Sequence, residues 1–351
     1  MNYKTIMLTI TALLAASSHA ADRSTYPGEH WEIVSPAALG WFAEGLAGAQ
    51  RFSESVPTAA VVVIHHGVVV AQWGKTDSPY MCHSMRKAML SALIGIAASE
   101  GKLDIGRTLD AYGIDDVEPA LTPDEKKATL RDLITARSGI YHPAAYEPRS
   151  MSAERPERGS HAPGTFFFYN NWDFNAAGAI YEKAADEKIG EAFMRRIAGP
   201  IGMEDFEPKH FRYLQEPKSN YPAYLFQMTA RDLARVGLLM ARGGAWKDTQ
   251  IVPKEWVKES ATGHSDAGHS GFGYMWWTAR PEDNRLFATV TEPGAFGTSG
   301  LGGHNMVVMP ESDIVVVHRA NTSMPDLPEV SDEDFATILE MILTAKPNEG
   351  K

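Results

Sequence analysis

The chain has 351 residues, a formal net charge of −11 and a hydrophobic content of 44%. An acidic chain without basic blocks argues against a nucleic acid or an anionic membrane as its partner. The single cysteine, Cys82, excludes an internal disulfide, so stability has to come from a buried core. A chain of this length can build one, and we expect two lobes.

The first twenty residues, Met1 to Ala20, have the pattern of a secretory signal peptide. Lys4 provides the positive end, Ile6 to Ala15 the apolar segment, and Ser18-His19-Ala20 the small-residue cleavage site. The apolar run is too short to span a membrane, and no other segment is long enough. We therefore expect a periplasmic or secreted protein with no membrane span in the mature chain.

Helical and strand patterns alternate in three blocks along the chain. The first block predicts a helix over Pro36 to Gln50 and a hairpin of Thr58 to Ile64 and Val68 to Trp73, joined by His65-His66-Gly67. The middle block is helical, with predicted helices at Ser84 to Glu100, Leu130 to Ala136, Asp173 to Ala185 and Ile189 to Ala198, and a long loop over Tyr141 to Gly164.

The last block returns to strands. It predicts a helix over Leu233 to Ala241 with Thr229 as its N-cap, strands at Tyr274 to Thr278, Leu286 to Val290, Asn305 to Met309 and Ile314 to His318, and a final helix over Asp332 to Ala345. We expect residues 21–80 and 225–348 to form one sheet-containing lobe. Residues 81–224 would form an inserted helical lobe, with the active site between the two.

The strongest chemical candidate is Ser84 with Lys87, at the start of a predicted apolar helix. Residues three apart on a helix are neighbours, so the amine lies beside the hydroxyl. Burial disfavours the ammonium form, and a neutral Lys87 can take a proton from Ser84. A second Ser-x-x-Lys, Ser99 to Lys102, falls where that helix should end, next to Gly101. A plain N-terminal helix serine is the alternative for Ser84.

Two further segments carry candidate polar groups. Tyr169 and Asn171 follow the aromatic run Phe166 to Phe168, which we expect to anchor the loop in the core. They form either an acid/base group with a hydrogen-bond donor, or a core-edge tyrosine with a helix N-cap. Gly297 to Gly303 precedes a strand and allows backbone N–H groups to approach an oxyanion, although a glycine-rich turn without function is the alternative.

Other chemistry has little support in the sequence. Ser299 lacks the strand-to-helix context of a Gly-x-Ser-x-Gly nucleophile. His264, Asp266 and His269 share a polar loop that could hold a metal, but such loops are usually solvated. The chain contains no His-Glu-x-x-His, no cysteine pair, no phosphate loop and no dinucleotide fingerprint. We therefore expect no cofactor and no metal.

Taken in order, these motifs resemble those of the penicillin-recognising serine hydrolases, in particular class C β-lactamases, their esterase relatives and the 6-aminohexanoate-dimer hydrolases. Thr129 to Ile140 is similar to the family's TxxDLLTHTSGL segment, and Ala162 to Asn171 is similar to its PGxxFxYSN segment. The resemblance covers about Pro57 to Asn321. It implies an α+β fold of the β-lactamase/transpeptidase type, an α/β sandwich whose antiparallel sheet is flanked by helices and which carries an inserted all-helical lobe.

The resemblance also implies roles for the candidate residues. Ser84 would be the acylated nucleophile, Lys87 its general base, and Tyr169 the group that passes a proton to the leaving group. Asn171 would position the substrate. The backbone N–H groups of Ser84 and Leu301, the latter following Ser299 and Gly300, would form the oxyanion hole.

One position departs from the family pattern, because Thr298 replaces the basic residue of the usual Lys-Thr-Gly or His-Thr-Gly motif. That cation helps to bind a substrate carboxylate, and His304, His318 or Arg319 are candidates to replace it. We expect an exported serine hydrolase of small esters or amides. A class C-like β-lactamase or D-amino-acid peptidase is an alternative, as is an inactive protein that binds cell-wall fragments. The substrate would be a small molecule or peptide-like compound.

Overall fold

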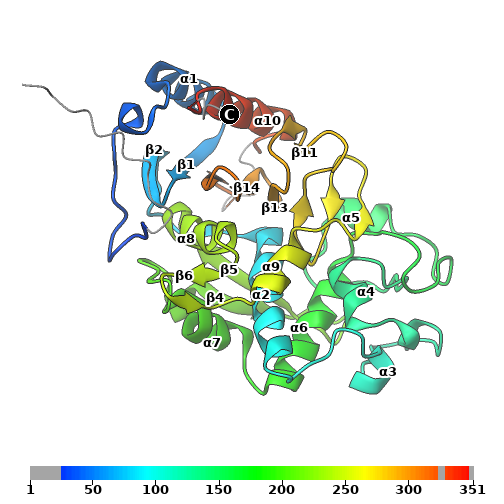
Figure 1. The fold of residues 1–351 in the computed structure, drawn as a ribbon. Helices are drawn as coiled ribbons and strands as arrows, with labels where there is room; N and C mark the ends of the chain where they lie inside the picture. The colour runs from blue at the N-terminus through cyan, green and yellow to red at the C-terminus, as the bar shows by residue number, and fades with distance from the viewer. Residues whose placement is uncertain (1–24, 323–328, 348–351) are drawn as a thin grey trace, which may run out of the picture.

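An eight-stranded antiparallel sheet forms the centre of the computed structural model, which describes residues 25–322 and 329–347 (Figure 1). The predicted signal peptide lies outside the described residues. β1 (Thr58–His65) pairs with β15 (Ile314–Ala320), so the two ends of the chain fold together. The remaining strands in sheet order are β2 (Val68–Gly74) beside β1, then β14 (His304–Met309), β13 (Phe296–Gly300), β10 (Trp277–Thr278), β9 (Gly271–Phe272) and β8 (Ser265–Asp266).

Helices cover both faces of this sheet. Side chains alternate along a strand, so Val61 faces one core and Val62 the other. α1 (Ala43–Glu54) and α10 (Asp332–Thr344) pack side by side over the Val61 face, at the top of Figure 1. α8 (Ala230–Ala241) covers the opposite face, and its predicted cap is confirmed because the side chain of Thr229 accepts a hydrogen bond from the backbone N–H of Asp232.

A helical layer lies beyond α8, in the lower half of Figure 1. At its centre, α2 (Arg86–Ser99) is buried on all sides from Arg86 to Ala97. The other helices are α3 (Leu109–Tyr112), α4 (Leu130–Ile134), α5 (Arg149–Ala153), α6 (Asn171–Ala185), α7 (Ile189–Phe193) and α9 (Lys254–Ser260). No helix in the described ranges is both long enough and apolar enough to cross a membrane.

Several predicted elements have different bounds in the structure. The first predicted helix is broken, because Gly40 in a left-handed conformation (φ 74°) ends a 3₁₀ turn over Pro36–Leu39 before α1 begins. The predicted strand at Leu286 to Val290 is instead a hairpin of β11 (Arg285–Leu286) and β12 (Thr289–Val290), since two left-handed residues reverse the chain. Of the strand predicted from Tyr274, only Trp277–Thr278 forms.

The region predicted as helical also contains strands that the sequence analysis missed. β3 (Tyr80–Met81), β5 (Ala223–Met228) and β4 (Phe211–Leu214) form a three-stranded sheet in that order. Outside that region, a two-stranded ribbon that was also missed joins β6 (Ala245–Trp246) to β7 (Thr249–Gln250). These strands are two to six residues long, too short to give a clear periodic pattern.

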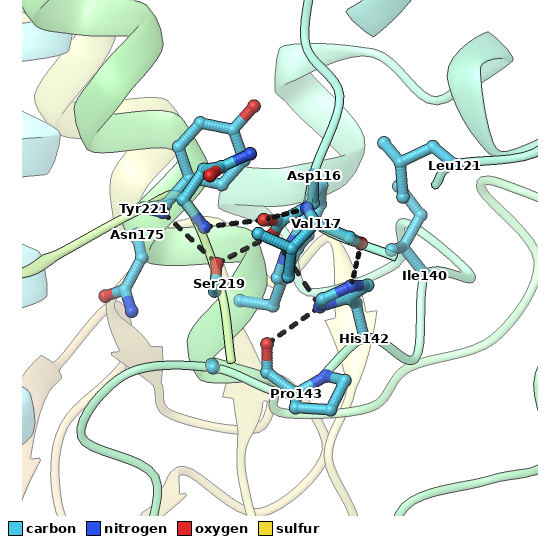
Figure 2. A network of polar contacts seen from close by, with 12 residues as sticks. Asp116, Val117, Leu121, Ile140, His142, Pro143, Asn175, Ser219 and Tyr221 are labelled. Atoms are coloured by element: carbon cyan, nitrogen blue, oxygen red, sulfur yellow. Dashed lines mark hydrogen bonds and ion pairs between the residues drawn. The ribbon is translucent and has the colours of Figure 1, made fainter. Parts of the chain in front are cut away.

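A buried polar network holds the loops beside the helical layer together (Figure 2). The Asp116 carboxylate accepts hydrogen bonds from Trp172 Nε1 and Ser219 Oγ, both at 2.6 Å, and from the backbone N–H of Asn220 at 2.5 Å. The ring of His142 lies 3.6 Å from the same carboxylate and bonds to the Val117 carbonyl oxygen. Three segments distant in the sequence therefore meet at one aspartate.

Replacing Asp116 by alanine should destabilise the protein, because it leaves several buried donors without an acceptor. We expect the free energy of unfolding, measured by urea denaturation, to fall by about 2–4 kcal/mol. Asp124→Ala is the matched control, since this carboxylate pairs with Lys127 on the surface, and it should leave the free energy of unfolding nearly unchanged. Equal effects of the two variants would contradict this role of the network.

Candidate active site

The turn that carries Ser84 is fixed by contacts from two sheets. Ser84 lies in a 3₁₀ turn over His83–Met85 that leads directly into α2. The backbone N–H of Cys82 donates to the Phe226 carbonyl oxygen of β5 at 2.9 Å. From the central sheet, Arg319 donates to the carbonyl oxygens of Tyr80 and Met81 at 2.8 and 3.1 Å. The serine therefore sits on backbone that is held from both sides.

Ser84, Lys87 and Tyr169 meet in space. Lys87 Nζ lies 2.7 Å from Ser84 Oγ and 2.7 Å from the Tyr169 hydroxyl. Ser84 and Lys87 are neighbours because they are three residues apart where the helix begins. Tyr169 comes from the loop before α6, and its ring stacks on Trp277 at 5.4 Å between centroids. The structure thus brings together the three residues predicted to be catalytic.

The surroundings of Lys87 favour its neutral amine. The residue is 1% exposed, and its Nζ lies 4.8 Å from the centre of the Phe174 ring. Burial, reinforced by the nearby Arg86 guanidinium, holds the pKa of Lys87 well below its ordinary value. Burial also raises the pKa of the Tyr169 hydroxyl to about 12, so this phenol keeps its proton at neutral pH. A neutral amine beside a serine hydroxyl can act as its base.

Asn171 lies at the cleft but is not a helix cap. The N-cap of α6 is Asn170, whose side chain accepts a hydrogen bond from the backbone N–H of Trp172, so the cap alternative for Asn171 is wrong. Asn171 Nδ2 donates to the carbonyl oxygen of Tyr146 at 2.5 Å. Its Oδ1 is buried and has no hydrogen-bond partner among the described residues. Asn171 therefore orients the Tyr146 loop and has a free acceptor.

The aromatic run before Tyr169 behaves differently from the prediction. Phe167 packs against Phe272 in the core, at 5.6 Å between ring centres. Phe166 is 41% exposed and stacks on the ring of His161 instead. Phe168 lines the cleft. Phe168 also packs edge-on against the buried Tyr141, at 5.7 Å between ring centres, so Phe167 and Phe168 anchor the loop while Phe166 is exposed.

The glycine-rich segment lines the same cleft as Tyr169. Gly300, at the end of β13, lies so close to the nucleophile turn that a Cβ atom there would be 2.6 Å from the Cys82 carbonyl oxygen. Only glycine allows that approach. Ser299, Gly300 and Leu301 line the same cavity as Ser84, and Leu301 is 54% exposed. Both predicted N–H donors of the oxyanion hole therefore belong to residues of one cavity.

That cavity has a volume of about 1050 Å³ and is bordered by carboxylates. No Lys or Arg is among the described residues that line it. The acidic residues in its lining are Glu147, Glu154, Glu216, Glu329 and Asp332. Arg155 and Lys218 pair with Glu147, and Lys218 also pairs with Glu216. Three carboxylates of the lining thus have no ion-pair partner within the described ranges.

None of the residues proposed to replace the missing basic residue lies in the cavity lining. His304 and His318 are fully buried, and burial lowers the pKa of both imidazoles, that of His318 to about 4, so both rings are neutral at pH 7. Arg319 is also fully buried and bonds to the backbone before Ser84. The idea that one of them binds a substrate carboxylate is wrong, because all three are used inside the fold.

The sequence analysis missed His83 and Tyr146, which both line the cleft. His83 has left-handed backbone (φ 47°), and so does Tyr146 (φ 60°), a conformation that is rare for residues with bulky side chains. Their contact joins positions 63 residues apart. The only local signal was the position of His83 directly before Ser84.

The polar loop with His264, Asp266 and His269 was considered as a metal site. Within the described part of the chain, no three metal-binding side chains are grouped closely enough to hold an ion.

The fold and the cleft together define a serine hydrolase of the β-lactamase type. A family model described as β-lactamase matches residues 40–339, and the chain belongs to this family. It is similar to the 6-aminohexanoate-dimer hydrolase of Paenarthrobacter ureafaciens, with 33% identity over 302 residues that cover 79% of this chain and 76% of the relative. The predicted family and enzyme class are confirmed.

Solved structures share the fold at low sequence identity. A mutant of a class C β-lactamase has 16% identity and a TM-score of 0.64, covering 86% of this chain and 96% of its own. A family VIII carboxylesterase has 16% identity and a TM-score of 0.63, with coverages of 86% and 97%. The octameric penicillin-binding protein homologue of Pyrococcus abyssi has 20% identity, a TM-score of 0.59 and coverages of 87% and 76%. The predicted fold class is thereby confirmed.

We expect hydrolysis to require the free amine of Lys87. Because the pKa of Lys87 is lowered, the base is neutral above that pKa and is protonated as the pH falls through it. The profile of kcat/KM against pH should therefore lose activity on the acid side, with the midpoint well below 10.5. Lys87→Ala should lower kcat by about 100-fold or more. Lys102→Ala, in the second Ser-x-x-Lys, should keep the wild-type profile, and a midpoint near 10.5 would contradict the assignment.

Proposed function

We propose that this chain is an exported serine hydrolase that cleaves a small amide or ester through a covalent acyl-enzyme on Ser84. The observation that carries the proposal is the position of Lys87 Nζ, buried and 2.7 Å from both Ser84 Oγ and the Tyr169 hydroxyl. The signal-peptide pattern of Met1 to Ala20 supports export.

In the acylation step, Ser84 Oγ attacks the substrate carbonyl carbon and its proton passes to Lys87 Nζ. The negative charge that develops on the carbonyl oxygen is stabilised by the backbone N–H groups of Ser84 and Leu301. The bond between the carbonyl carbon and the leaving group then breaks. Tyr169 gives its proton to the departing amine or alcohol and regains one from Lys87, which suits a phenol whose pKa is raised.

In the deacylation step, a water molecule attacks the acyl carbon. Lys87, with Tyr169 beside it, takes a proton from that water, and the same backbone N–H groups stabilise the second oxyanion. The bond to Ser84 Oγ breaks, the serine regains its proton, and the carboxylic acid product leaves. The three side chains return to their initial protonation states, so no further reactant is needed.

The charges around the cleft favour a substrate that carries an ammonium group over one that carries a carboxylate. Three carboxylates in the lining have no ion-pair partner in the described part of the chain and attract a cation, and Thr298 removes the basic residue that would attract an anion. The 33% identical relative is named as a hydrolase of the 6-aminohexanoate dimer. We therefore propose linear amides or esters of amino-acyl type as the substrate class.

The first test is hydrolysis of p-nitrophenyl butyrate by the mature protein, by Ser84→Ala and by Ser99→Ala. The kcat of Ser84→Ala should be at least about 1000-fold lower than that of the wild type, because the nucleophile is removed. Ser99→Ala should match the wild type, since its hydroxyl only bonds to the Ile96 carbonyl oxygen at a helix end. Equal activity of the wild type and Ser84→Ala would show that the site has been assigned to the wrong serine.

Two alternative functions have different outcomes in the same assays. Turnover of nitrocefin or release of D-alanine from a D-Ala-D-Ala peptide at a rate above that of the amino-acyl substrates would favour a β-lactamase or D-amino-acid peptidase. Absence of hydrolysis, together with no mass increase from a serine-acylating phosphonate probe, would favour a protein that only binds cell-wall fragments.

The charge preference can be measured with three anilides of similar length. We expect kcat/KM to be highest for the p-nitroanilide of 6-aminohexanoate, lower for that of hexanoate and lowest for the mono-p-nitroanilide of adipate, by about 5-fold per step at low salt. The differences should shrink in 1 M NaCl, because salt screens exposed charges.

Matched variants identify the carboxylates responsible. Glu154→Gln with Asp332→Asn should reduce the preference for the amine, since both side chains line the cavity. Glu333→Gln is the control, because this exposed carboxylate lies in the same helical turn as Asp332 but outside the lining. Preference for the adipate derivative would overturn the proposed substrate class.

A further inference from the structure

Two basic side chains follow each other in the first turn of α2, and both are buried. Arg86 and Lys87 are each 1% exposed, and this turn contains no acidic residue. The N–H groups at the start of a helix carry partial positive charge, so the position disfavours cations. Apolar side chains would fill the same space without the cost of burying charge. The presence of two basic groups here therefore points to a role for their charge.

The surroundings of Arg86 hold its guanidinium without neutralising it. Nη2 donates to Asn175 Oδ1 of α6 at 3.0 Å, and Cζ lies 4.3 Å from the centre of the Tyr224 ring on β5. Nε and Nη1 are buried and have no hydrogen-bond partner among the described residues. Within that part of the chain, only a neutral amide accepts from this guanidinium. Its positive charge is therefore not compensated by an adjacent carboxylate.

Of the two side chains, only the lysine can give up its proton. An arginine keeps its charge at any pH at which proteins are assayed, whereas a buried lysine readily becomes neutral. Consecutive side chains on a helix point about 100° apart, so Arg86 and Lys87 do not face each other. Their charges interact through the protein interior, which screens them much less than water does.

The other titratable groups around this pair carry no charge at neutral pH. They are Tyr169 before α6, Tyr224 on β5, Tyr146 in the cleft loop and His83 in the turn before α2. Burial raises the pKa of each tyrosine and lowers that of His83 to about 4. None of these four groups can therefore balance the guanidinium charge.

Charged groups on the other elements near the start of α2 have different partners. The carboxyl group of Asp173 on α6 accepts from Ser138 Oγ, and Arg319 on β15 bonds to backbone before the nucleophile. The lysine and glutamate residues of α6, α7 and α9 are not buried. Arg86 is thus the charged group that acts on Lys87.

We propose that Arg86 is a positioning residue for the general base: its buried, uncompensated charge keeps Lys87 a neutral amine that can take the proton of Ser84. Arg86 does not line the cleft, so it acts through Lys87 and not on the substrate. Asn175 and Tyr224 hold the guanidinium in place. The inference rests on the proposed function and assigns a role to the residue between the serine and the lysine.

The test compares profiles of kcat/KM against pH for p-nitrophenyl butyrate. Arg86→Met keeps an unbranched side chain but removes the charge, so the pKa of Lys87 should rise and the amine should be protonated at higher pH. The acid-side midpoint should move up by about 1 pH unit or more. One pH unit below the wild-type midpoint, the variant should be about 10-fold less active, whereas the plateaus at high pH should agree within about 3-fold.

A double variant shows whether Arg86 acts through the lysine. In the Lys87→Ala background, Arg86→Met should leave the pH profile of the residual activity unchanged, because the group on which the charge acts is missing. A midpoint that still moves in this background would assign the effect to another group, such as His83, and would overturn the inference. The pKa of Tyr169, already about 12, lies above the range of the assay.

A second pair of variants keeps Arg86 and changes its neighbour. Asn175→Asp places a negative charge beside the guanidinium and should therefore weaken its effect on Lys87. Asn175→Ala is the matched control, since it loses the same contacts to Arg86 and to the Ala145 carbonyl oxygen but adds no charge. The acid-side midpoint should move up in Asn175→Asp and stay at the wild-type value in Asn175→Ala.

The remaining results each decide the question. A wild-type midpoint in Arg86→Met would overturn the inference, and so would an equal loss of activity at every pH, because Arg86 would then only support the fold. If Arg86→Met does not fold, equal midpoints in the two Asn175 variants would overturn the inference. The proposed function stands in all these cases. A wild-type protein that neither hydrolyses the ester nor reacts with the phosphonate probe would overturn both.

Discussion

The candidate active site depends on a buried lysine, Lys87, that has no carboxylate beside it among the residues the structure describes. Lys87 contacts two hydroxyl groups and two aromatic rings, and the charged group that most affects it is the Arg86 guanidinium. An ammonium ion in these surroundings would be poorly solvated, whereas a neutral amine is tolerated. A carboxylate beside Lys87 would stabilise its ammonium form, and the lysine could then no longer accept a proton from Ser84. The apolar burial of α2 therefore determines the chemistry as well as the packing.

Local patterns in the sequence predicted the parts of the site that depend on short spacing. The i, i+3 relation placed Lys87 beside Ser84, and strand alternation predicted the hairpin of β1 and β2. The sequence did not predict the contact of His83 with Tyr146, since nothing local links residues 63 positions apart. It also did not place Arg319, because a strand pattern does not show that one buried side chain bonds to a distant turn.

The same fold occurs in proteins described as a β-lactamase and as a carboxylesterase, so the fold alone does not select a substrate. Substrate selection therefore depends on the side chains that surround the cleft. Thr298 is a buried residue of β13, and the buried Arg319 of β15 is used to hold the backbone before Ser84. The cleft therefore receives its charge from the Tyr146 loop and the start of α10. Specificity can change there without disturbing the core.

The contact between Arg319 and the Tyr80 carbonyl joins positions 239 residues apart. Translation proceeds from the N-terminus, so the serine and its helix are made long before the strand that holds them in place. An incomplete chain that has just passed α2, or even α9, lacks the arginine that fixes the nucleophile turn. The turn that carries Ser84 therefore gains its contacts to the central sheet only after β15 has been synthesised and has paired with β1.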